Sequence, residues 1–369
     1  MLKFNVSVNG KELKKSVQAL AKVNGKAWGK GWSERYVNLT VFDNRLRLTV
    51  SNSSNGSIFS NMIEDVRGNG EIAANIDELL AAVKTFKDEI VYLELDYEAS
   101  SMNVFSNTAK AKVMVMEQLN EKAKVSTAWL TDKAVDNIEV KAFFDTVKRA
   151  QKFIAKDRIS GLAALRFEGV DGVMNLIAAD GYTLFKKELI STRFEEPFML
   201  KRDDVIALTK VEKLFNTQYF SVYYYNDKVI LTDAKGAAVC AFTVYDEFYP
   251  EWKKAFPTKY EVRLEVYNPK ELIDSLKAAK SYHTSSNPMK VRINGNVELS
   301  VTDQFVREIP DILKDEGKEL EIGFNPDYLI NAIGNEKGSF NMNFADKNQP
   351  VHIIKAHNEE LLVMPIRLI

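Results

Sequence analysis

The feature that most constrains the fold is a repeat in the positions where amphipathic helices begin. Six short apolar strands each run into such a helix, and successive helix starts are separated by 66, 65, 62, 66 and 57 residues. A near-constant period is typical of one supersecondary unit that recurs along a chain. We therefore expect six copies of one unit, with helices that begin near Asn9, Asn75, Val140, Arg202, Asn268 and Asn325.

Four of the six helix starts share a local register. An Asn stands at each of these starts and a Leu follows four residues later, as in Asn9 with Leu13 and Asn325 with Leu329. An Asn at the N-cap accepts hydrogen bonds from free N–H groups of the first turn, and Pro269 stands at the favoured first helical position. Each helix carries one apolar stripe, which predicts a helix laid on a sheet.

Between the helices, apolar and polar residues alternate around turn dipeptides. Asp43-Asn44, Asp180-Gly181 and Asn294-Gly295 each separate two such runs, which predicts a β-hairpin. Each unit therefore reads as one helix with antiparallel strands, and two units make a domain of ordinary size. The joints between domains fall near Asn120–Asp136 and near Pro257. We expect three domains, at 1–125, 126–257 and 258–369.

The chain ends in an unusually apolar segment. Its last nine residues hold seven apolar side chains, one proline and one charge, whereas chain ends are usually polar unless they are docked. Pro365 lacks an N–H and fits only an edge strand or a strand end. We expect a final strand over Glu360–Met364 and a tail on the surface beside it. The residues leave two interpretations open: the tail fills the chain's own core, or it walls an apolar groove for a partner.

The composition is that of a soluble globular protein, with 46% hydrophobic and 27% charged residues. No apolar run approaches the roughly 18 residues of a membrane span, and the N-terminus lacks the layout of a signal peptide. The single cysteine, Cys240, excludes an internal disulfide and suits a reducing compartment. We therefore expect a cytoplasmic protein.

Charge is segregated along a chain whose net charge is only −1. Residues 9–30 carry +5 and residues 140–158 carry +4, so the remainder is acidic. Either helix surfaces are simply rich in Lys, or these helices face a common polyanion. The loop 24–36 adds Lys and Arg with Trp28 and Trp32, which either clamp and stack on nucleic acid or cap the core of the first domain.

Motifs for catalysis and metal binding are missing. The three histidines, His283, His352 and His357, lack metal-ligand spacing, and one cysteine cannot build a zinc site. No phosphate-binding loop or nucleophile elbow is present. Asp180 lies in a hairpin turn, where an Asp more often shapes the turn than performs catalysis. We expect no enzyme activity, no cofactor and no metal.

Four motifs in order resemble the bacterial DNA polymerase III β subunit, the sliding clamp. They are Leu176–Leu184, Phe248–Pro257, Ile322–Leu329 and Leu362–Leu368, and they span the second and third domains of that family. The resemblance implies an α+β fold of three repeated DNA-clamp domains, each with two helices packed on antiparallel sheets. Two such chains would close head to tail into a ring around duplex DNA.

The resemblance also implies function and partners. The ring would slide on DNA through nonspecific phosphate contacts and tether a replicative polymerase as a processivity factor. DNA polymerase and clamp-loader subunits would insert short apolar peptides into a groove between the second and third domains. Residues expected to contact DNA are Lys22, Lys26, Lys30, Lys148, Arg149 and Lys152. Residues expected to line the groove are Ile159, Gly181, Tyr182, Thr183, Leu184, Pro250, Lys254, Ala255, Val351, Leu362, Met364, Pro365, Ile366, Arg367 and Leu368.

The chain departs from the family pattern at several positions. Thr183 and Lys254 stand where the family often has Arg, so planar guanidinium contacts at the groove rim are lost or weakened. Pro350 replaces a small polar residue, and Ile369 extends the tail by one. Two alternatives remain: a hydrolase on a repeated α+β scaffold that uses Asp180, and a clamp-like protein that binds replication factors without encircling DNA.

Overall fold

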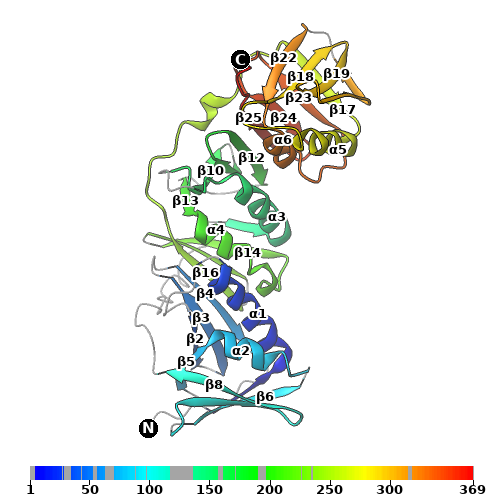
Figure 1. The fold of residues 1–369 in the computed structure, drawn as a ribbon. Coiled ribbons are helices and arrows are strands. Elements are labelled where there is room, and N and C mark those ends of the chain that lie inside the picture. The colour runs from blue at the N-terminus through cyan, green and yellow to red at the C-terminus, as the bar shows by residue number, and fades with distance from the viewer. Residues whose placement is uncertain are drawn as a thin grey trace. The chain divides into compact units, whose positions relative to one another are not determined.

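A computed structural model describes residues 5–26, 28, 35–42, 44–52, 56–62, 70–87, 89–96, 98–116, 136–156, 161–170, 172–189, 197–225, 227–233, 236–314 and 318–368. The chain divides into two compact units, whose elements are labelled in Figure 1. Unit 1 comprises Met1–Lys148 and Ile190–Tyr245, and unit 2 comprises Arg149–Leu189 and Asp246–Ile369. The predicted boundary at residue 125 lies outside the described residues, and the division into three domains stays a prediction.

The described part of the chain contains six α-helices, and each begins within one residue of a predicted start. Four of them are N-capped by the predicted Asn; Asn75 Oδ1, for example, accepts from Asp77 N and Glu78 N over 3.1 Å each. These bonds satisfy N–H groups that the helix itself leaves free. The helices are α1 (Gly10–Lys26), α2 (Ile76–Val83), α3 (Val140–Ala150), α4 (Arg202–Leu208), α5 (Pro269–Lys280) and α6 (Pro326–Ile333).

Unit 1 is built on one long antiparallel sheet with helices packed on it. α1 buries Leu13, Val17 and Leu20 and packs against α2, α4 and β3. The strand order across the sheet is β1-β6-β7-β8-β5-β2-β3-β4-β16-β15-β14-β9. In chain order these are β1 (Asn5–Asn9), β2 (Tyr36–Phe42), β3 (Arg45–Ser51), β4 (Ser57–Met62), β5 (Gly70–Asn75), β6 (Ile90–Asp96), β7 (Ser101–Phe105), β8 (Lys110–Met116), β9 (Asp136–Glu139), β14 (Tyr219–Tyr225), β15 (Lys228–Asp233) and β16 (Ala238–Thr243), with β13 (Phe198–Lys201) before α4.

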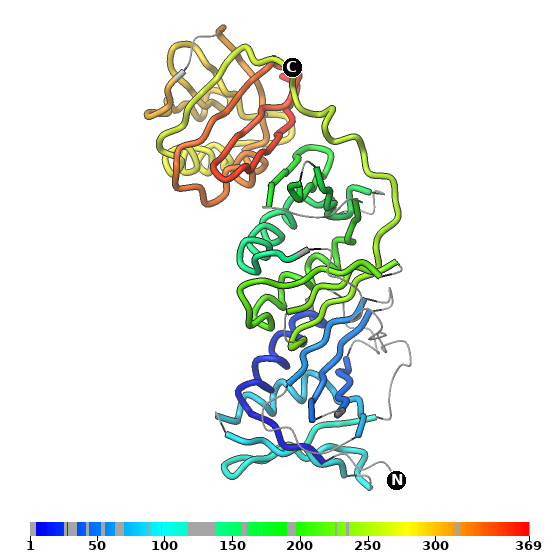
Figure 2. The backbone as a smooth tube through the Cα atoms, turned by 180° about the vertical axis from the view of Figure 1, so that it is seen from behind, coloured from blue at the N-terminus to red at the C-terminus, as the bar shows by residue number. Residues whose placement is uncertain are grey.

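Unit 2 holds two antiparallel sheets, with orders β10-β11-β12-β25-β24-β23-β17-β21 and β20-β19-β18-β22. Its helices α5 and α6 pack on each other, and α6 also contacts β12 and β25. The C-terminal segment, red in Figure 2, lies beside orange and yellow segments of the same unit. The strands are β10 (Ala164–Val170), β11 (Val173–Ala179), β12 (Thr183–Leu189), β17 (Val262–Val266), β18 (Met289–Asn294), β19 (Asn296–Val301), β20 (Phe305–Ile309), β21 (Ile312–Lys314), β22 (Leu320–Phe324), β23 (Phe340–Phe344), β24 (Val351–Lys355) and β25 (Glu359–Val363).

The predicted hairpins are confirmed. β11 pairs with β12 and β18 with β19, each in antiparallel register across the expected turn, and β2 pairs antiparallel with β3, although Asp43 of the turn between them lies outside the described residues. Gly181 and Gly295 adopt φ of 88° and 73°, a backbone region that glycine enters without steric cost. The final strand is also confirmed and lies inside the sheet, between β12 and β24.

The repeated unit is a strand, a helix and three further strands. Two junctions between copies of this repeat follow one rule. The last strand of one copy pairs with the last strand of the copy three positions further along the chain. In unit 1 this is β4 with β16, the first and fourth copies, and in unit 2 it is β12 with β25, the third and sixth. The last strands of the second and fifth copies are β8 and β20. They belong to different compact units and have no such partner among the strand pairs described within the chain.

Candidate partner groove and basic helix faces

The C-terminal segment is fixed to unit 2 by main-chain hydrogen bonds. Beyond β25, Met364 N donates to Tyr182 O and Ile366 N donates to Gly323 O, each over 2.8 Å. Pro365 stands between these two residues, at a position where the pairing needs no N–H donor. The expected docking of the chain end is therefore confirmed.

Gly323 permits this close approach of the tail. A Cβ atom at position 323 would lie 2.6 Å from Ile366 O and 2.8 Å from a side-chain carbon of Leu368. Because real Cβ atoms do not come so near a carbonyl oxygen, any larger residue would displace the tail from β22.

An apolar cluster lies at the junction of β11, β12 and β25. Its buried members are Ala179, Leu184 and Leu362. Half-buried side chains cover this floor and leave apolar area that a partner side chain can contact, as in pockets that bind apolar ligands. These covering residues are Leu162, Trp252 and Phe256.

Beside this cluster, three side chains form an aromatic and thioether rim. Tyr182 is 59% exposed, and its ring stacks on Tyr328 with centroids 5.5 Å apart and 15° between the planes. Met364 is 39% exposed, and its main-chain N–H bonds to Tyr182 O. Exposed aromatic rings and flexible thioethers favour contact with apolar partner groups. We call the apolar cluster, its covering residues and this rim together the groove.

Asp180 shapes the turn that carries Tyr182. Its Oδ1 accepts from Tyr182 N, Thr183 N and Thr183 Oγ1 over 2.9, 2.7 and 2.9 Å. This is the side-chain mimicry of a backbone turn that Asp commonly provides. The turn role predicted for Asp180 is confirmed, and the side chain is committed to it.

The predicted groove residues fall into three groups by burial, and Ile159 lies outside the described residues. The buried ones support the groove from behind, whereas the exposed and half-buried ones remain available to a partner. Buried are Thr183, Leu184, Val351 and Leu362; half-buried are Pro365, Ile366 and Leu368; exposed are Gly181, Tyr182, Pro250, Lys254, Ala255, Met364 and Arg367.

Sequence reasoning missed four groove residues. Leu162, Trp252, Phe256 and Tyr328 contribute side chains to the cluster or the rim. Three of them lie within the motifs Phe248–Pro257 and Ile322–Leu329, so the motifs pointed to the right segments without identifying these side chains. Leu162 lies outside every motif, and no sequence signal marks it.

A polar cluster cross-links the strands next to the apolar floor. Glu360 on β25 accepts a hydrogen bond from Lys186 Nζ over 2.7 Å, and its carboxylate lies 2.9 Å from His352 Nε2. The hydroxyl of Tyr260 lies 2.6 Å from His352 Nδ1. The hydrogen bond with His352 is the main reason why the pKa of Glu360 falls to about 2, and Lys186 adds to it. Glu360 therefore stays ionised and holds β12, β24 and β25 together.

Arg149, a predicted DNA contact, makes several hydrogen bonds within unit 2. Its guanidinium donates to Asn331 O and Ala332 O at the C-terminal end of α6, and its Nε lies 3.3 Å from Glu359 Oε1. Positive charge is favourable at that end of a helix. The side chain is therefore occupied within unit 2, and DNA contact by Arg149 would have to compete with these bonds.

The other predicted DNA contacts lie on helices or at helix ends. Lys22 on α1 and Lys152 directly after α3 are exposed or nearly so. Lys148 is half-buried and pairs with Glu212 and Asp145. The side chain of Lys26 and the whole of Lys30 lie outside the described residues. Two of the predicted lysines are thus available at the surface, and the DNA contacts stay a prediction.

Trp28, from the basic and aromatic loop, points into unit 1. Its indole N–H donates to Asp204 Oδ1 over 3.0 Å, and Asn52 Nδ2 donates to the same oxygen over 2.9 Å. Asp204 belongs to the predicted second domain, so this contact indicates a structural role for Trp28 but leaves the capping of the first domain's core a prediction. Trp32 lies outside the described residues.

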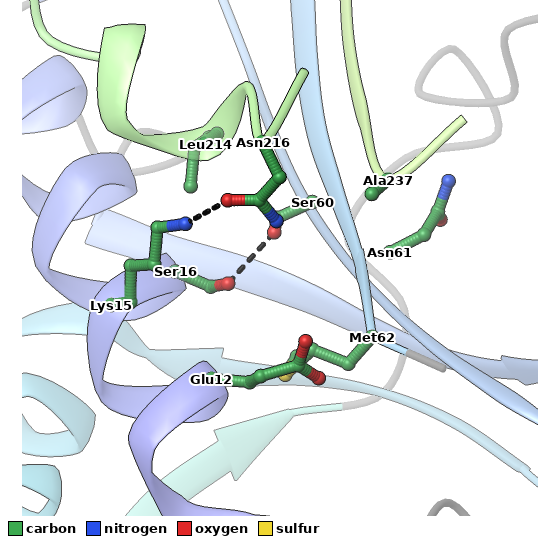
Figure 3. Close-up of a pocket in the computed structure, with 9 residues that line it drawn as sticks. All are labelled: Glu12, Lys15, Ser16, Ser60, Asn61, Met62, Leu214, Asn216 and Ala237. Atoms are coloured by element: carbon green, nitrogen blue, oxygen red, sulfur yellow. Dashed lines mark hydrogen bonds between the residues drawn. The ribbon is translucent and has the colours of Figure 1, made fainter. Parts of the chain in front are cut away.

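A second concave site lies in unit 1 between α1, β4 and the segment after η5 (Glu212–Leu214) (Figure 3). Its cavity volume is about 40 Å³, which is small for a ligand site. Ser16 Oγ and Ser60 Oγ lie 2.7 Å apart, and Lys15 donates to Asn216. The polar groups thus bond mainly to one another, which leaves few to direct at a ligand. The lining residues are Glu12, Lys15, Ser16, Ser60, Asn61, Met62, Leu214, Asn216 and Ala237.

Within the described residues, no group of three His, Cys, Asp or Glu side chains is placed to hold a metal ion. Among these residues there is also no helix long and apolar enough to span a membrane.

Comparisons with known proteins agree with this geometry. Residues 253–367 match the family model for the C-terminal domain of the DNA polymerase III beta subunit. The whole chain resembles the DNA polymerase III beta subunit of Thermotoga maritima, with 22% identity, a TM-score of 0.86, and coverage of 99% of this chain and 100% of that one. No curated protein matches the chain in sequence.

Two further solved structures show the same likeness. The sliding clamp of Bacillus subtilis is 16% identical, with a TM-score of 0.85 and full coverage of both chains. The sliding clamp of Bartonella birtlesii bound to griselimycin is 16% identical, with a TM-score of 0.85 and coverage of 99% and 100%. The family resemblance is therefore confirmed by sequence in the C-terminal part, and the α+β clamp fold is confirmed over the whole chain.

Proposed function

We propose that this chain is a sliding clamp, a processivity factor that encircles duplex DNA and tethers a replicative polymerase. One observation carries the proposal: the full clamp fold is present together with an apolar groove beside the docked C-terminal tail. Such a protein raises the effective concentration of its polymerase at the primer end and needs no chemistry of its own. We accordingly propose a non-enzymatic protein of the cytoplasm, built as three domains at 1–125, 126–257 and 258–369.

Retention on DNA would rest on basic helices. The segments around α1 and α3 carry +5 and +4 in a chain of net charge −1. Lysines such as Lys22 and Lys152 would contact phosphates without reading bases, which permits sliding and makes retention sensitive to salt.

Ring closure follows from the junction rule of the repeated unit. The last strands of copies one and four, and of copies three and six, pair within the chain. The same rule joins copies two and five, that is β8 of one chain with β20 of a second. Met114 on β8 is 53% exposed and Val306 on β20 is 60% exposed, as expected for apolar side chains that a second copy covers. Two chains joined twice in this way form a closed homodimer.

The groove would capture partner proteins. Short apolar peptides of polymerase and clamp-loader subunits would place side chains between the rim of Tyr182, Tyr328 and Met364 and the half-buried rings of Trp252 and Phe256. The buried floor of Leu184 and Leu362 supports both walls. Interfaces of this type depend on a few apolar anchors.

The deciding experiment measures solution mass and DNA retention. We expect light scattering to show a species of two chains, and a clamp loaded on nicked circular DNA to dissociate when the DNA is linearised. Met114→Glu should yield single chains, because a charge would be buried at the joint, whereas Tyr224→Glu, at an exposed site on β14, should leave two. A single-chain wild type, or equal retention on linear and circular DNA, would refute the proposal.

The two alternatives predict other results. A hydrolase would lose turnover in Asp180→Asn, but this carboxylate already accepts three hydrogen bonds in its own turn. A clamp-like protein that only sequesters replication factors would lose all activity when Met364–Ile369 is deleted and would not respond to Lys22→Ala with Lys152→Ala.

A further inference from the structure

One wall of the groove between the predicted second and third domains has no fully buried side chain. This wall is the turn η6 (Trp252–Ala255), and the structure places no buried residue in it. Its one internal ion pair, between Lys254 and Glu251, is exposed and contributes little to order. Because Trp252 is only half-buried where it packs on the apolar floor, polar contacts are needed as well to fix the position of this turn.

One carboxylate holds two successive side chains of the turn. Glu168 on β10 accepts from Trp252 Nε1 through Oε2 over 3.1 Å, and Lys253 Nζ lies 3.2 Å from its Oε1. Arg166, on the same strand, donates its Nε to Glu168 Oε2 over 2.9 Å. Each carboxylate oxygen is therefore used, and the acceptor is itself fixed in direction by Arg166.

The environment keeps this carboxylate charged. The side chain of Glu168 is 15% exposed, and burial alone would raise its pKa. The hydrogen bonds from Arg166, Trp252 and Lys253 outweigh burial and hold the pKa below its ordinary value. A charged acceptor makes stronger hydrogen bonds than a neutral one. The hydrogen bond from Trp252 to Glu168 is therefore strong at neutral pH.

The other end of the turn is seated on aromatic rings. The Trp252 and Phe256 rings meet edge to face at 6.0 Å, and Phe256 meets His352 in the same manner at 5.0 Å. Trp252 therefore contacts both Glu168 and Phe256. Losing the hydrogen bond would free Trp252 to swing, and with it the half-buried cover over Leu184 and Leu362.

We propose that Glu168 is the positioning residue of the partner groove, which it holds in its binding shape by anchoring the Trp252–Ala255 turn. The inference rests on the proposed function for the identity of the groove. The anchoring itself is a property of the free protein and is measurable without any partner.

The first measurement reports on the turn. The chain has four Trp, so fluorine NMR of the protein labelled with 5-fluorotryptophan shows few signals, and Trp252→Phe assigns the one of interest. In Glu168→Ala the Trp252 signal should shift toward that of solvent-exposed fluoroindole and sharpen, while the other signals stay in place. Glu168→Gln retains an acceptor oxygen and should keep the signal near the wild-type position. An unmoved Trp252 signal in Glu168→Ala would overturn the proposal.

The second measurement reports on binding, with griselimycin as the probe because a sliding clamp of the same fold, that of Bartonella birtlesii, is bound to it. Glu168→Ala should weaken its affinity about tenfold, and Glu168→Gln should restore most of it. Glu251→Ala is the matched control, since it removes an acid that directly precedes the turn and forms an exposed ion pair with Lys254, and it should change neither readout. A released Trp252 with unchanged affinity would overturn the positioning role. Failure of the proposed function would show separately, as wild-type protein that is not retained on circular DNA.

Discussion

Asp204 is a buried acid whose replacement tests the electrostatics of unit 1. It is 3% exposed at the start of α4, and its Oδ1 accepts from Trp28 and Asn52. Burial raises its pKa from 3.8 to about 6; those two hydrogen bonds oppose the rise, and the charge of Asp203 adds to it. Asp204→Asn keeps an acceptor oxygen for both donors and removes the buried charge.

The size of the expected change in stability follows from the difference between the pKa of Asp204 in the folded and in the unfolded chain. Between 3.8 in the unfolded chain and about 6 in the folded one, the ionised carboxylate costs about 3 kcal/mol of stability at high pH. Because the folded pKa is raised, the folded state takes up this proton first as the pH falls. The stability of the wild type relative to Asp204→Asn should therefore rise by about 2 kcal/mol between about pH 8 and about pH 4.5.

The assay is urea unfolding of both proteins at several pH values. Groups other than Asp204 titrate in both proteins, so their contributions largely cancel in the difference. A flat difference for Asp204→Asn, or one that falls toward low pH, would refute the reasoning.

Three further predictions concern single side chains or pairs of them. Asn325→Ala removes the N-cap of α6, whose Oδ1 accepts from Asp327 N, and should lower the free energy of unfolding in urea by about 1 kcal/mol, whereas Asn325→Asp should retain it. Gly323→Ala should displace the tail from Ile366 onward and weaken the binding of a short apolar peptide at the groove, with little change in solution mass; an unchanged affinity for that peptide would contradict the close approach. Lys22→Ala with Lys152→Ala should flatten the dependence of DNA retention on salt, by about one unit of slope for each phosphate that the two lysines neutralise in the wild type. An unaltered slope would place the DNA-binding residues elsewhere.

The accuracy of the predicted fold follows from the short range of its signals. An Asn cap acts on N–H groups two or three residues away, as Asn75 does, and a turn such as Asp180-Gly181 decides its hairpin within four residues. Both signals come from residues that are close together in the sequence. Each local pattern is weak by itself, but six copies at a near-constant spacing together predict the repeated architecture.

The site was predicted less completely, because its contacts join distant residues. Arg149 was expected to contact DNA, yet it meets Glu359 and the end of α6. Tyr182 was expected in the groove, but its stacking partner Tyr328 was not. Nothing in the spacing of residues reveals such pairs, since each partner is chosen by the packing of several strands.

The sequence alone determined the repeated strand-and-helix unit, its caps and turns, and the docking of an apolar chain end, because hydrogen bonding and hydrophobic periodicity act along neighbouring residues. Only the tertiary structure decided which charges remain available and which side chains cover the groove. The free energy of an ionic or apolar group depends on what the folded chain brings around it, and that environment comes from segments far away along the chain.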